Sequence, residues 1–125
     1  MRISFTDREA DVMQALWEHG SSTVAEVREY LADPLAYTTV LTVLRTLETK
    51  GYIGHEEAGR GHRFFTKVKQ SAARKNAVQH LTDKLFKGSA ELLFSHMVSE
   101  QKLSAEQISR MRQLLAEHVD GEKPQ

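Results

Sequence analysis

Apolar side chains in the first half of the chain recur with the period of amphipathic helices. Thr6 is followed three residues later by Glu9, which is the capping-box pattern of a helix start. The apolar residues behind it at helical spacing are Ala10, Met13, Leu16 and Trp17, with Val12 beside them. This pattern predicts a first helix that ends at Gly20.

A second capping-box pattern, formed by Thr23 and Glu26, predicts a shorter helix directly afterwards. Its apolar positions are Val24, Val27 and Leu31. Because the residue before a proline avoids helical dihedral angles, we expect this helix to close at Asp33 and Pro34.

The segment from Tyr37 to Lys50 is rich in β-branched residues, which by propensity favour a strand. Its periodicity favours a helix instead. One helical stripe collects Val40, Val43, Leu44 and Leu47, whereas the threonines at 39, 42, 46 and 49 fall outside it. The segment is also long for a strand. We therefore predict a helix over residues 37–50 that stops at Gly51.

A β-hairpin is predicted next, with strands over residues 52–55 and 62–68 and a flexible turn over 57–61. The residues after the hairpin are predicted to form helices, first over residues 71–87 and then over 89–99. A capping-box pattern at Ser104 and Gln107 opens the last helix. Residues 120–125 are expected to form a frayed tail.

Three helices followed by a two-stranded hairpin are the elements of a winged helix-turn-helix domain, whose third helix enters the major groove of DNA. Solvated helix faces favour Glu, Lys, Gln and Ala, so the threonine-rich outer face of the 37–50 helix is unusual. Threonine hydroxyls can bond to phosphates or base edges, and Arg45 can reach a phosphate or a guanine. A packed domain interface that tolerates small residues is the alternative explanation.

The predicted hairpin tip places Arg60 between Gly59 and Gly61, which permit a close approach of the backbone. Its side chain could reach into the minor groove or along the phosphates, and His62 and Arg63 are further candidate contacts. An ordinary turn with an arginine in solvent would have the same sequence.

The predicted C-terminal helices carry more large apolar residues than two short elements without a sheet can cover. The helix over 89–99 has almost no polar side, so it must be buried from several directions. A second copy of the chain is the simplest way to bury it, and the alternative is packing against the first domain. The candidate dimerisation residues are Leu81, Leu85, Leu92, Leu93, Phe94, Met97, Ile108, Met111 and Leu115.

These observations predict a mainly α fold with a small β-hairpin. Residues 1–69 would form a winged helix-turn-helix DNA-binding domain, and residues 70–125 a C-terminal helical dimerisation region.

The 125 residues are 40% hydrophobic, which is enough to bury a core. Because the chain lacks cysteine, a long apolar run and a secretion signal at its start, we expect a cytoplasmic, nucleoid-associated protein without membrane insertion.

Formal net charge is zero, but the charges are unevenly distributed. Between Arg45 and Lys75 there are eight cations and three anions, whereas acids dominate the residues before them. A neutral chain can therefore carry one basic surface, although a solvated face would give the same count.

Neither a metal site nor an active site is predicted. The histidines, at 19, 55, 62, 80, 96 and 118, lack the close paired spacing of metal ligands. The sequence contains no nucleophile elbow, no P-loop and no HExxH motif. We therefore expect a protein that is not an enzyme and that uses no cofactor.

Several stretches together resemble the penicillinase-repressor family, which includes the β-lactamase and methicillin-resistance repressors and copper-responsive repressors. They are residues 9–17, 37–40, 47–52 and 59–60, followed by residues 88–89 and 100–104, which are similar to the family's dimerisation helices. The resemblance implies a dimeric winged-helix repressor on an inverted-repeat operator of double-stranded DNA. It also implies that Thr38, Thr39, Thr42 and Arg45 face the operator, with Tyr37 near the helix start.

The branches of this family differ in how they are controlled. In the β-lactam branch a membrane sensor-protease signals, and the repressor is cut in a region that corresponds to His96 and Met97. This sequence departs from the family's best-known cleavage dipeptide there. The copper branch carries a C-terminal cysteine cluster, and the lack of cysteine here excludes copper sensing by that chemistry.

One alternative function uses the same fold. The outer face of the 37–50 helix could dock on a partner protein, which would make the chain a winged-helix protein–protein interaction module without sequence-specific DNA binding. The neutral net charge slightly favours this alternative. A protein partner that survives nuclease treatment would distinguish the two.

Overall fold

A computed structural model of the protein describes residues 2–122, with side chains through residue 120. The chain divides into two compact units, of which the first ends at His80 and the second begins at Leu81. The first unit therefore extends past residue 69, where the sequence places the boundary between domains. Among the described residues, no helix is both long enough and apolar enough to cross a membrane.

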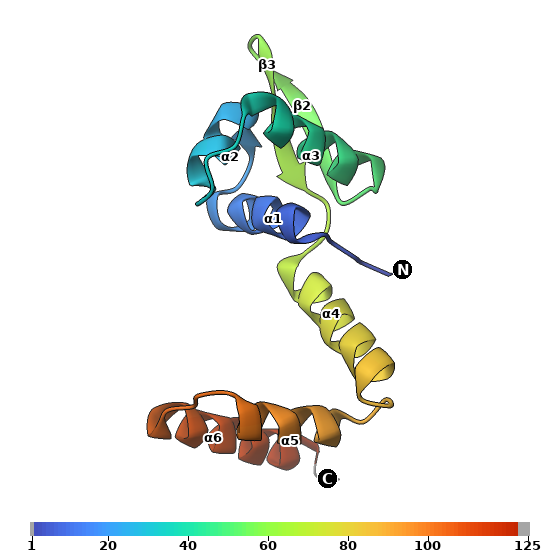
Figure 1. Cartoon of the computed structure of the whole chain (residues 1–125), viewed down its shortest axis with the longest axis vertical. Coiled ribbons are helices and arrows are strands. Elements are labelled where there is room, and N and C mark those ends of the chain that lie inside the picture. Colours follow the sequence, from blue (N-terminus) through green and yellow to red (C-terminus); the bar gives the residue numbers. More distant parts are fainter. Residues whose placement is uncertain (1, 123–125) are drawn as a thin grey trace. The chain divides into compact units, whose positions relative to one another are not determined.

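The first unit packs three helices on a small antiparallel sheet (Figure 1). Its elements are α1 (Asp7–His19), β1 (Ser22–Thr23), α2 (Val24–Tyr30), α3 (Tyr37–Thr49), β2 (Ile53–Ala58) and β3 (Gly61–Thr66). The strand order is β1-β3-β2, with β3 antiparallel to both neighbours. The β2–β3 hairpin extends beyond the helices as the wing (Figure 1).

Apolar stripes on the three helices meet the sheet in one core, as the periodicity predicts. Its buried members are Val12, Met13, Leu16, Val24, Val27, Val40, Leu44, Leu47, Tyr52, Ile53, Phe64 and Val68. Val43, Leu31 and Trp17 pack against this core while partly exposed, and Ala10 is exposed rather than buried. The prediction of a helix rather than a strand over residues 37–50 is confirmed.

Both predicted capping boxes in this unit are present. The Thr6 amide donates to Glu9 Oε1 at 2.8 Å, and the Thr23 amide donates to Glu26 Oε1 at 2.9 Å. In each case the threonine hydroxyl accepts from the glutamate amide. These bonds satisfy backbone donors that the first helical turn leaves without partners.

Two local predictions are corrected, and one strand is present that the sequence does not predict. α2 ends at Tyr30, because Leu31 already has an extended backbone, so the helix closes before Asp33 and Pro34. The five-residue turn is in fact two residues long, because Ala58 pairs with Gly61. The third strand, β1, was not predicted, since a two-residue strand leaves no periodic signal.

The second unit is helical. α4 (Gln70–Leu85) begins in the first unit and crosses the boundary, and α5 (Ala90–Glu100) and α6 (Ala105–Glu122) follow. The capping box of Ser104 and Gln107 is present at the start of α6. α6 continues to Glu122, so the first part of the expected frayed tail is helical, and residues 123–125 lie outside the described residues.

Candidate nucleic-acid interface

The outer face of α3 is determined by the stripe that the helix buries. Val40, Leu44 and Leu47 are completely inaccessible to solvent. The opposite side of the helix carries five exposed residues, which we call the α3 outer face: Thr38, Thr42, Arg45, Thr46 and Thr49. Thr39 and Tyr37 are exposed beside this face, at the start of the helix. The structure thus presents one arginine among short hydroxyl side chains.

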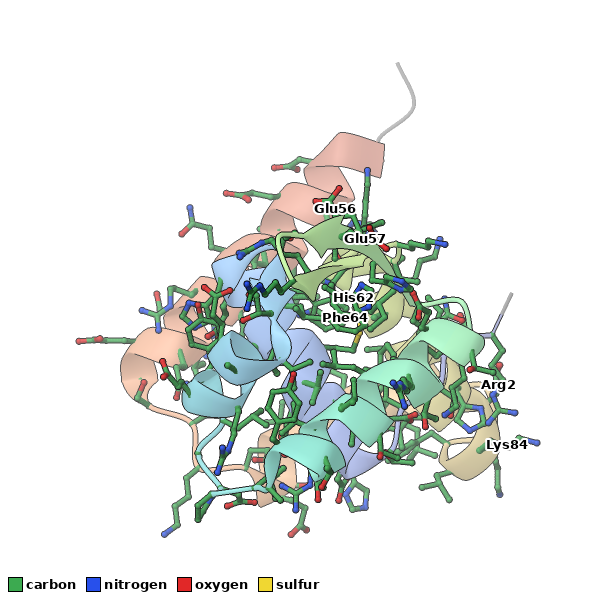
Figure 2. All side chains as sticks on the ribbon, turned by 90° about the horizontal axis from the view of Figure 1, so that it is seen from above. Arg2, Glu56, Glu57, His62, Phe64 and Lys84 are labelled. Atoms are coloured by element: carbon green, nitrogen blue, oxygen red, sulfur yellow. The ribbon has the colours of Figure 1, made fainter. Side chains whose placement is uncertain are left out.

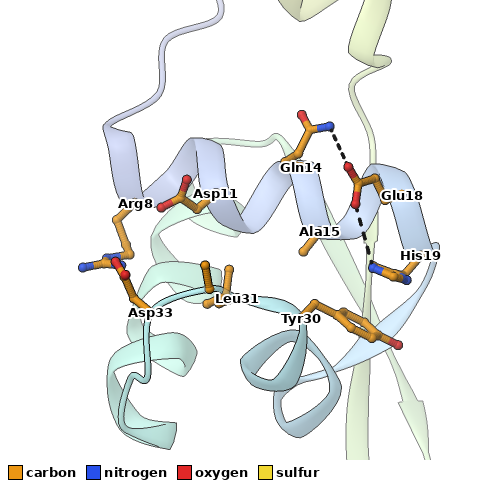
Figure 3. Close-up of a pocket in the computed structure, with 10 residues that line it drawn as sticks. Arg8, Asp11, Gln14, Ala15, Glu18, His19, Tyr30, Leu31 and Asp33 are labelled. Atoms are coloured by element: carbon orange, nitrogen blue, oxygen red, sulfur yellow. Dashed lines mark hydrogen bonds and ion pairs between the residues drawn. The ribbon is translucent and has the colours of Figure 1, made fainter.

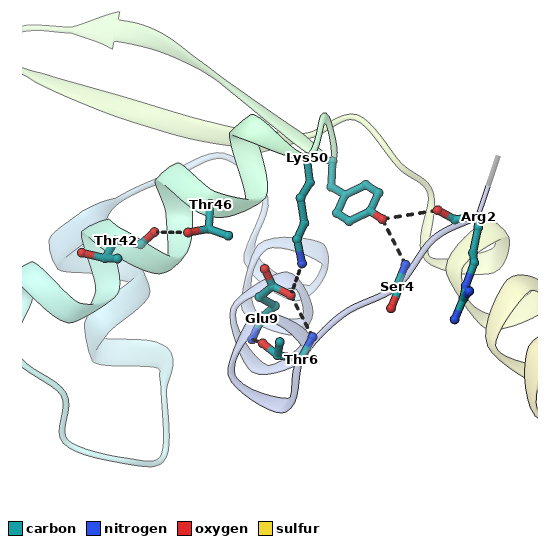
Figure 4. A network of polar contacts seen from close by, with 8 residues as sticks. Arg2, Ser4, Thr6, Glu9, Thr42, Thr46 and Lys50 are labelled. Carbon is teal, nitrogen blue, oxygen red and sulfur yellow. Dashed lines mark hydrogen bonds and ion pairs between the residues drawn. The ribbon is translucent and has the colours of Figure 1, made fainter.

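Most threonines of this face use their hydroxyl hydrogen within the helix. Thr46 Oγ1 donates to the Thr42 carbonyl at 3.0 Å (Figure 4). Thr42 Oγ1 donates to the Thr38 carbonyl at 2.9 Å, and Thr49 Oγ1 donates to the Arg45 carbonyl at 3.0 Å. A threonine bonded in this way still offers its methyl group and its oxygen lone pairs to the outside. Around Thr42, Thr46 and Thr49 the face is therefore apolar and accepting rather than donating, and its donors are Arg45 and the hydroxyl of Thr38.

α3 begins without a side-chain cap. Its N-cap residue is Ala36, which offers no oxygen to the first-turn amides, whereas threonines cap α1 and α2. The amides of Thr39 and Val40 both bond to the Ala36 carbonyl. Tyr37, with 47% of its surface exposed, lies at this end of the helix.

The wing tip is a two-residue turn of Gly59 and Arg60. Gly59 has a φ of 64°, which L side chains rarely adopt, and glycine adopts it without steric cost. Arg60 follows it as an exposed residue. The predicted exposed arginine at the hairpin tip is present.

The other two predicted wing residues are in different situations. Arg63 is half-buried: its guanidinium donates to the Ser21 carbonyl at 2.6 Å and pairs with Glu26 at 3.1 Å. His62 is exposed on β3, two residues from Phe64 (Figure 2). Its ring packs edge-on against His55, with centroids 4.6 Å apart. Arg63 is thus bound within the fold, whereas His62 faces solvent.

The pKa of Glu26 is affected by its role in the fold. The hydrogen bond from the Thr23 backbone amide lowers this pKa most, and the Arg63 guanidinium lowers it further. Desolvation raises it by less, so the pKa lies below its usual value. Glu26 therefore stays charged and holds the Arg63 guanidinium near α2.

A second charged pair lies under the C-terminal end of α3 and was missed by sequence reasoning. Lys50 Nζ contacts Glu9 Oε1 at 2.8 Å, and Glu9 is only 4% exposed (Figure 4). The capping-box pattern identified Glu9 as a helix cap, but nothing in the sequence pairs it with a residue 41 positions away. The pair connects the start of α1 to the end of α3.

A hollow of about 330 Å³ lies along α1 and is lined on its other side by the end of α2 and the loop after it (Figure 3). At one end Arg8 pairs with Asp33 at 2.9 Å, and at the other the rings of His19 and Tyr30 stack at 3.7 Å. None of the candidate DNA-contacting residues lines it.

The second unit exposes its apolar residues. No residue of α5, all of which the structure describes, is buried. An apolar hollow of about 260 Å³ between α5 and α6 is lined by Phe94, Val98, Leu103, Ile108, Met111, Leu115 and Arg112. The remaining predicted dimerisation residues, Leu81, Leu85, Leu92, Leu93 and Met97, are exposed or partly exposed on α4 and α5, and so is His96.

No group of three or more histidine, aspartate or glutamate side chains within residues 2–120 is arranged to hold a metal ion.

Comparisons with known proteins agree with this architecture. A family model described as penicillinase repressor matches residues 5–117. A penicillinase repressor of Bacillus licheniformis is 25% identical over 120 residues, which cover 94% of each chain.

Two solved structures share the fold. Transcriptional regulator Tm0710 from Thermotoga maritima has a TM-score of 0.51 at 16% identity, with 96% of this chain and 80% of that chain covered. A MarR family protein from Bacillus stearothermophilus has a TM-score of 0.50 at 18% identity, with 97% and 78% covered. The predicted winged helix-turn-helix fold is confirmed.

Proposed function

This chain belongs to the penicillinase repressor family of transcriptional repressors, and we propose that it acts as a dimer on an inverted-repeat DNA operator. The observation that carries the proposal is the α3 outer face. Its threonines and Arg45 lie opposite a completely buried stripe, so the fold presents them and not the apolar residues. A helix of this kind fits the major groove, which admits one helix.

The hydrogen bonds within α3 suggest how this face would read bases. Because Thr42 and Thr46 donate their hydroxyl hydrogens to carbonyls of their own helix, we expect them to contact thymine methyls and to accept from base amino groups. Arg45 supplies the donor that these threonines lack, directed at a guanine edge or a phosphate. Tyr37, Thr38 and Thr39, at the start of α3, would contact DNA beside them.

The wing supplies the contacts that do not depend on sequence. Arg60, exposed at the tip, would neutralise a phosphate or enter the minor groove, with His62 beside it on β3. Arg63 was predicted to contact DNA as well. Because Ser21 and Glu26 hold its guanidinium, we propose that it mainly orients the wing.

The exposed apolar surface of the second unit supports a homodimer. Unpartnered Leu92, Met97 and Leu115 are between 43% and 52% exposed, which is costly for side chains of this size in water. A second copy related by a two-fold axis would cover the apolar surfaces of both chains at once. It would also place the α3 helices of the two chains on two half-sites. We propose a dimer on this basis, and a cytoplasmic, nucleoid-associated one because a repressor acts on DNA.

Release from DNA would follow from damage to the same region. His96 and Met97 lie in the middle of α5, and a protease needs an extended segment, so cutting there requires α5 to unwind first. A membrane sensor-protease is the partner that the family resemblance implies. Loss of α5 would remove Phe94 and Val98 from the wall of the apolar hollow and with them the dimer.

The proposal is tested by selecting binding sites from a pool of random duplexes with the full-length protein. We expect the selection to yield an inverted repeat. Thr42→Ala should change which base is preferred at one position of each half-site, by about 1–3 kcal/mol of discrimination. Gln14→Ala, at an exposed position of α1, is the matched control and should select the wild-type sequence.

Failure to enrich any sequence at low salt would overturn the proposal. If the protein instead retained a protein partner after nuclease treatment, and mutation of Thr42 abolished that complex, the α3 outer face would serve protein–protein interaction. An unchanged site preference in Thr42→Ala would contradict the reading role assigned to this residue.

A further inference from the structure

Residues 2–5 form a segment, here called the N-terminal arm, that contacts the start of the wing. The Ser4 amide donates to Tyr52 Oη at 3.0 Å, and this hydroxyl donates to the Arg2 carbonyl at 3.4 Å (Figure 4). The Phe5 ring packs edge-on against Tyr52, with centroids 5.0 Å apart. Tyr52 is buried and joins the end of α3 to β2, so the arm is attached next to the reading helix.

The same arm also contacts α4. The Ile3 amide donates to Asn76 Oδ1 at 3.2 Å, and Arg2 Nη2 lies 2.9 Å from His80 Nε2. Asn76 in turn donates from Nδ2 to the Ala72 carbonyl, which orients its side chain on the helix. Four consecutive residues therefore link Tyr52 with two successive turns of α4.

The start of α4 is held at other points too. Trp17 Nε1 donates to the Val68 carbonyl at 2.9 Å, directly before the helix, and Ala73 is buried. His80, which lies 2.9 Å from Arg2, is the last residue of the first compact unit. The arm, Trp17 and Ala73 together join the first half of α4 to the rest of the first unit.

We propose that the N-terminal arm holds the first half of α4 against the winged-helix unit and thereby determines which half-site spacing the dimer accepts. Tyr52 and Asn76 are the positioning residues of this device. The inference rests on the proposed operator-binding function, because spacing has a meaning only for a dimer on two half-sites.

The stiffness of α4 relates the arm to the spacing of the half-sites. α4 is a single continuous helix from Gln70 to Leu85, so a rotation of its first half also turns Leu81 and Leu85, which are among the proposed dimerisation residues. Each base pair inserted between half-sites moves one of them by about 3.4 Å and turns it by about 35°. A dimer in which each α4 is held rigidly against its winged-helix unit accepts one spacing between half-sites. A dimer in which α4 moves relative to that unit accepts several spacings.

The test compares two double variants of the full-length protein. Tyr52→Phe with Asn76→Ala removes the two side-chain oxygens that accept from the Ser4 and Ile3 amides, and it keeps the buried aromatic ring at position 52. Tyr30→Phe with Ser71→Ala makes the same kinds of change at exposed positions and is the control. Amide hydrogen exchange at Ile3 and Ser4 reports the arm directly, without DNA, and protection should be lost only in the first variant.

DNA binding is then measured on the inverted repeat that the wild type selects, with the spacer lengthened or shortened by one and two base pairs, and on a single half-site. We expect wild type and control to lose about tenfold in affinity per misplaced base pair, and the arm variant to lose less than about threefold. Affinity for the single half-site should stay within about twofold, because the reading surface is unchanged.

An arm variant with the wild-type spacing profile would overturn the inference, and so would unprotected Ile3 and Ser4 amides in the wild type. If the wild type selects no inverted repeat, the proposed function fails, and the exchange experiment still decides whether the arm holds α4.

Discussion

Glu9 shows how one residue can serve two parts of the fold. Its carboxylate accepts from the Thr6 amide at the start of α1 and from Lys50 at the end of α3. Burial raises the pKa of Glu9, but the bonds from Lys50 and Thr6 together lower it by more, so the pKa lies below the usual 4.5. The charged form of Glu9 therefore stabilises the folded state.

This stabilisation depends on pH in a defined direction. A depressed pKa contributes fully above the unfolded value of about 4.5 and is lost as the pH falls through the lower folded value. We expect Glu9→Gln to lower the free energy of unfolding by about 1–2 kcal/mol at pH 7. Urea unfolding between pH 7 and pH 3 should show the difference from wild type shrinking in acid. Glu29→Gln, at an exposed position, should show little difference, and a constant gap for Glu9→Gln would contradict the pairing.

Sequence reasoning at this scale predicted which side chains face outward but not how they bond. The threonine positions follow from periodicity, because a helix that buries Val40, Leu44 and Leu47 must expose the opposite face. The bonds that hold Arg63 could not be predicted. They arise because β1 pairs with β3 and brings Ser21 within reach, and a two-residue strand has no sequence signature.

At the scale of elements, the capping boxes and the α3 stripe were predictable because each depends on residues within two turns of a helix. The wing was predictable as a hairpin, but its turn was placed too widely, since both strands continue to the pair Ala58 and Gly61. Strand pairing depends on backbone bonds to residues farther along the chain, which local composition does not reveal.

The wing leads to a prediction about the salt dependence of DNA binding. Removing the Arg60 side chain removes one phosphate contact per protomer, so the slope of log affinity against log salt should decrease by about 0.9 per contact. We expect Arg60→Ala to weaken binding to all sequences by similar factors while the selected site stays the same. Fluorescence anisotropy from low to moderate salt measures both effects. Lys102→Ala, which removes a cation from the second unit, is the control, and an equal slope for Arg60→Ala and wild type would exclude the contact.

At the scale of the whole molecule, the predicted apolar excess of the C-terminal helices is present as exposed surface. The sequence places a domain boundary at residue 69, yet the first compact unit includes α4 as far as His80. This part of α4 is bonded to the start of the chain: Asn76 accepts from the Ile3 amide, and His80 contacts Arg2. Contacts between residues more than 70 positions apart cannot be inferred from helical periodicity.

The exposed apolar surface of the second unit supports a homodimer, and this dimer can be tested without DNA. Leu115 lines the apolar hollow between α5 and α6, and 52% of its surface is exposed in the single chain. If a second copy covers this hollow, Leu115→Glu buries a carboxylate in the interface, which should cost about 3 kcal/mol and raise the dimer Kd roughly 100-fold. Gln113→Glu adds the same charge on α6 outside that hollow and should leave the dimer intact. Sedimentation equilibrium at micromolar concentration measures all three proteins, and a monomeric wild type would remove the dimer from the proposed mechanism. Equal dissociation constants for the two variants would mean instead that the chains associate through another surface.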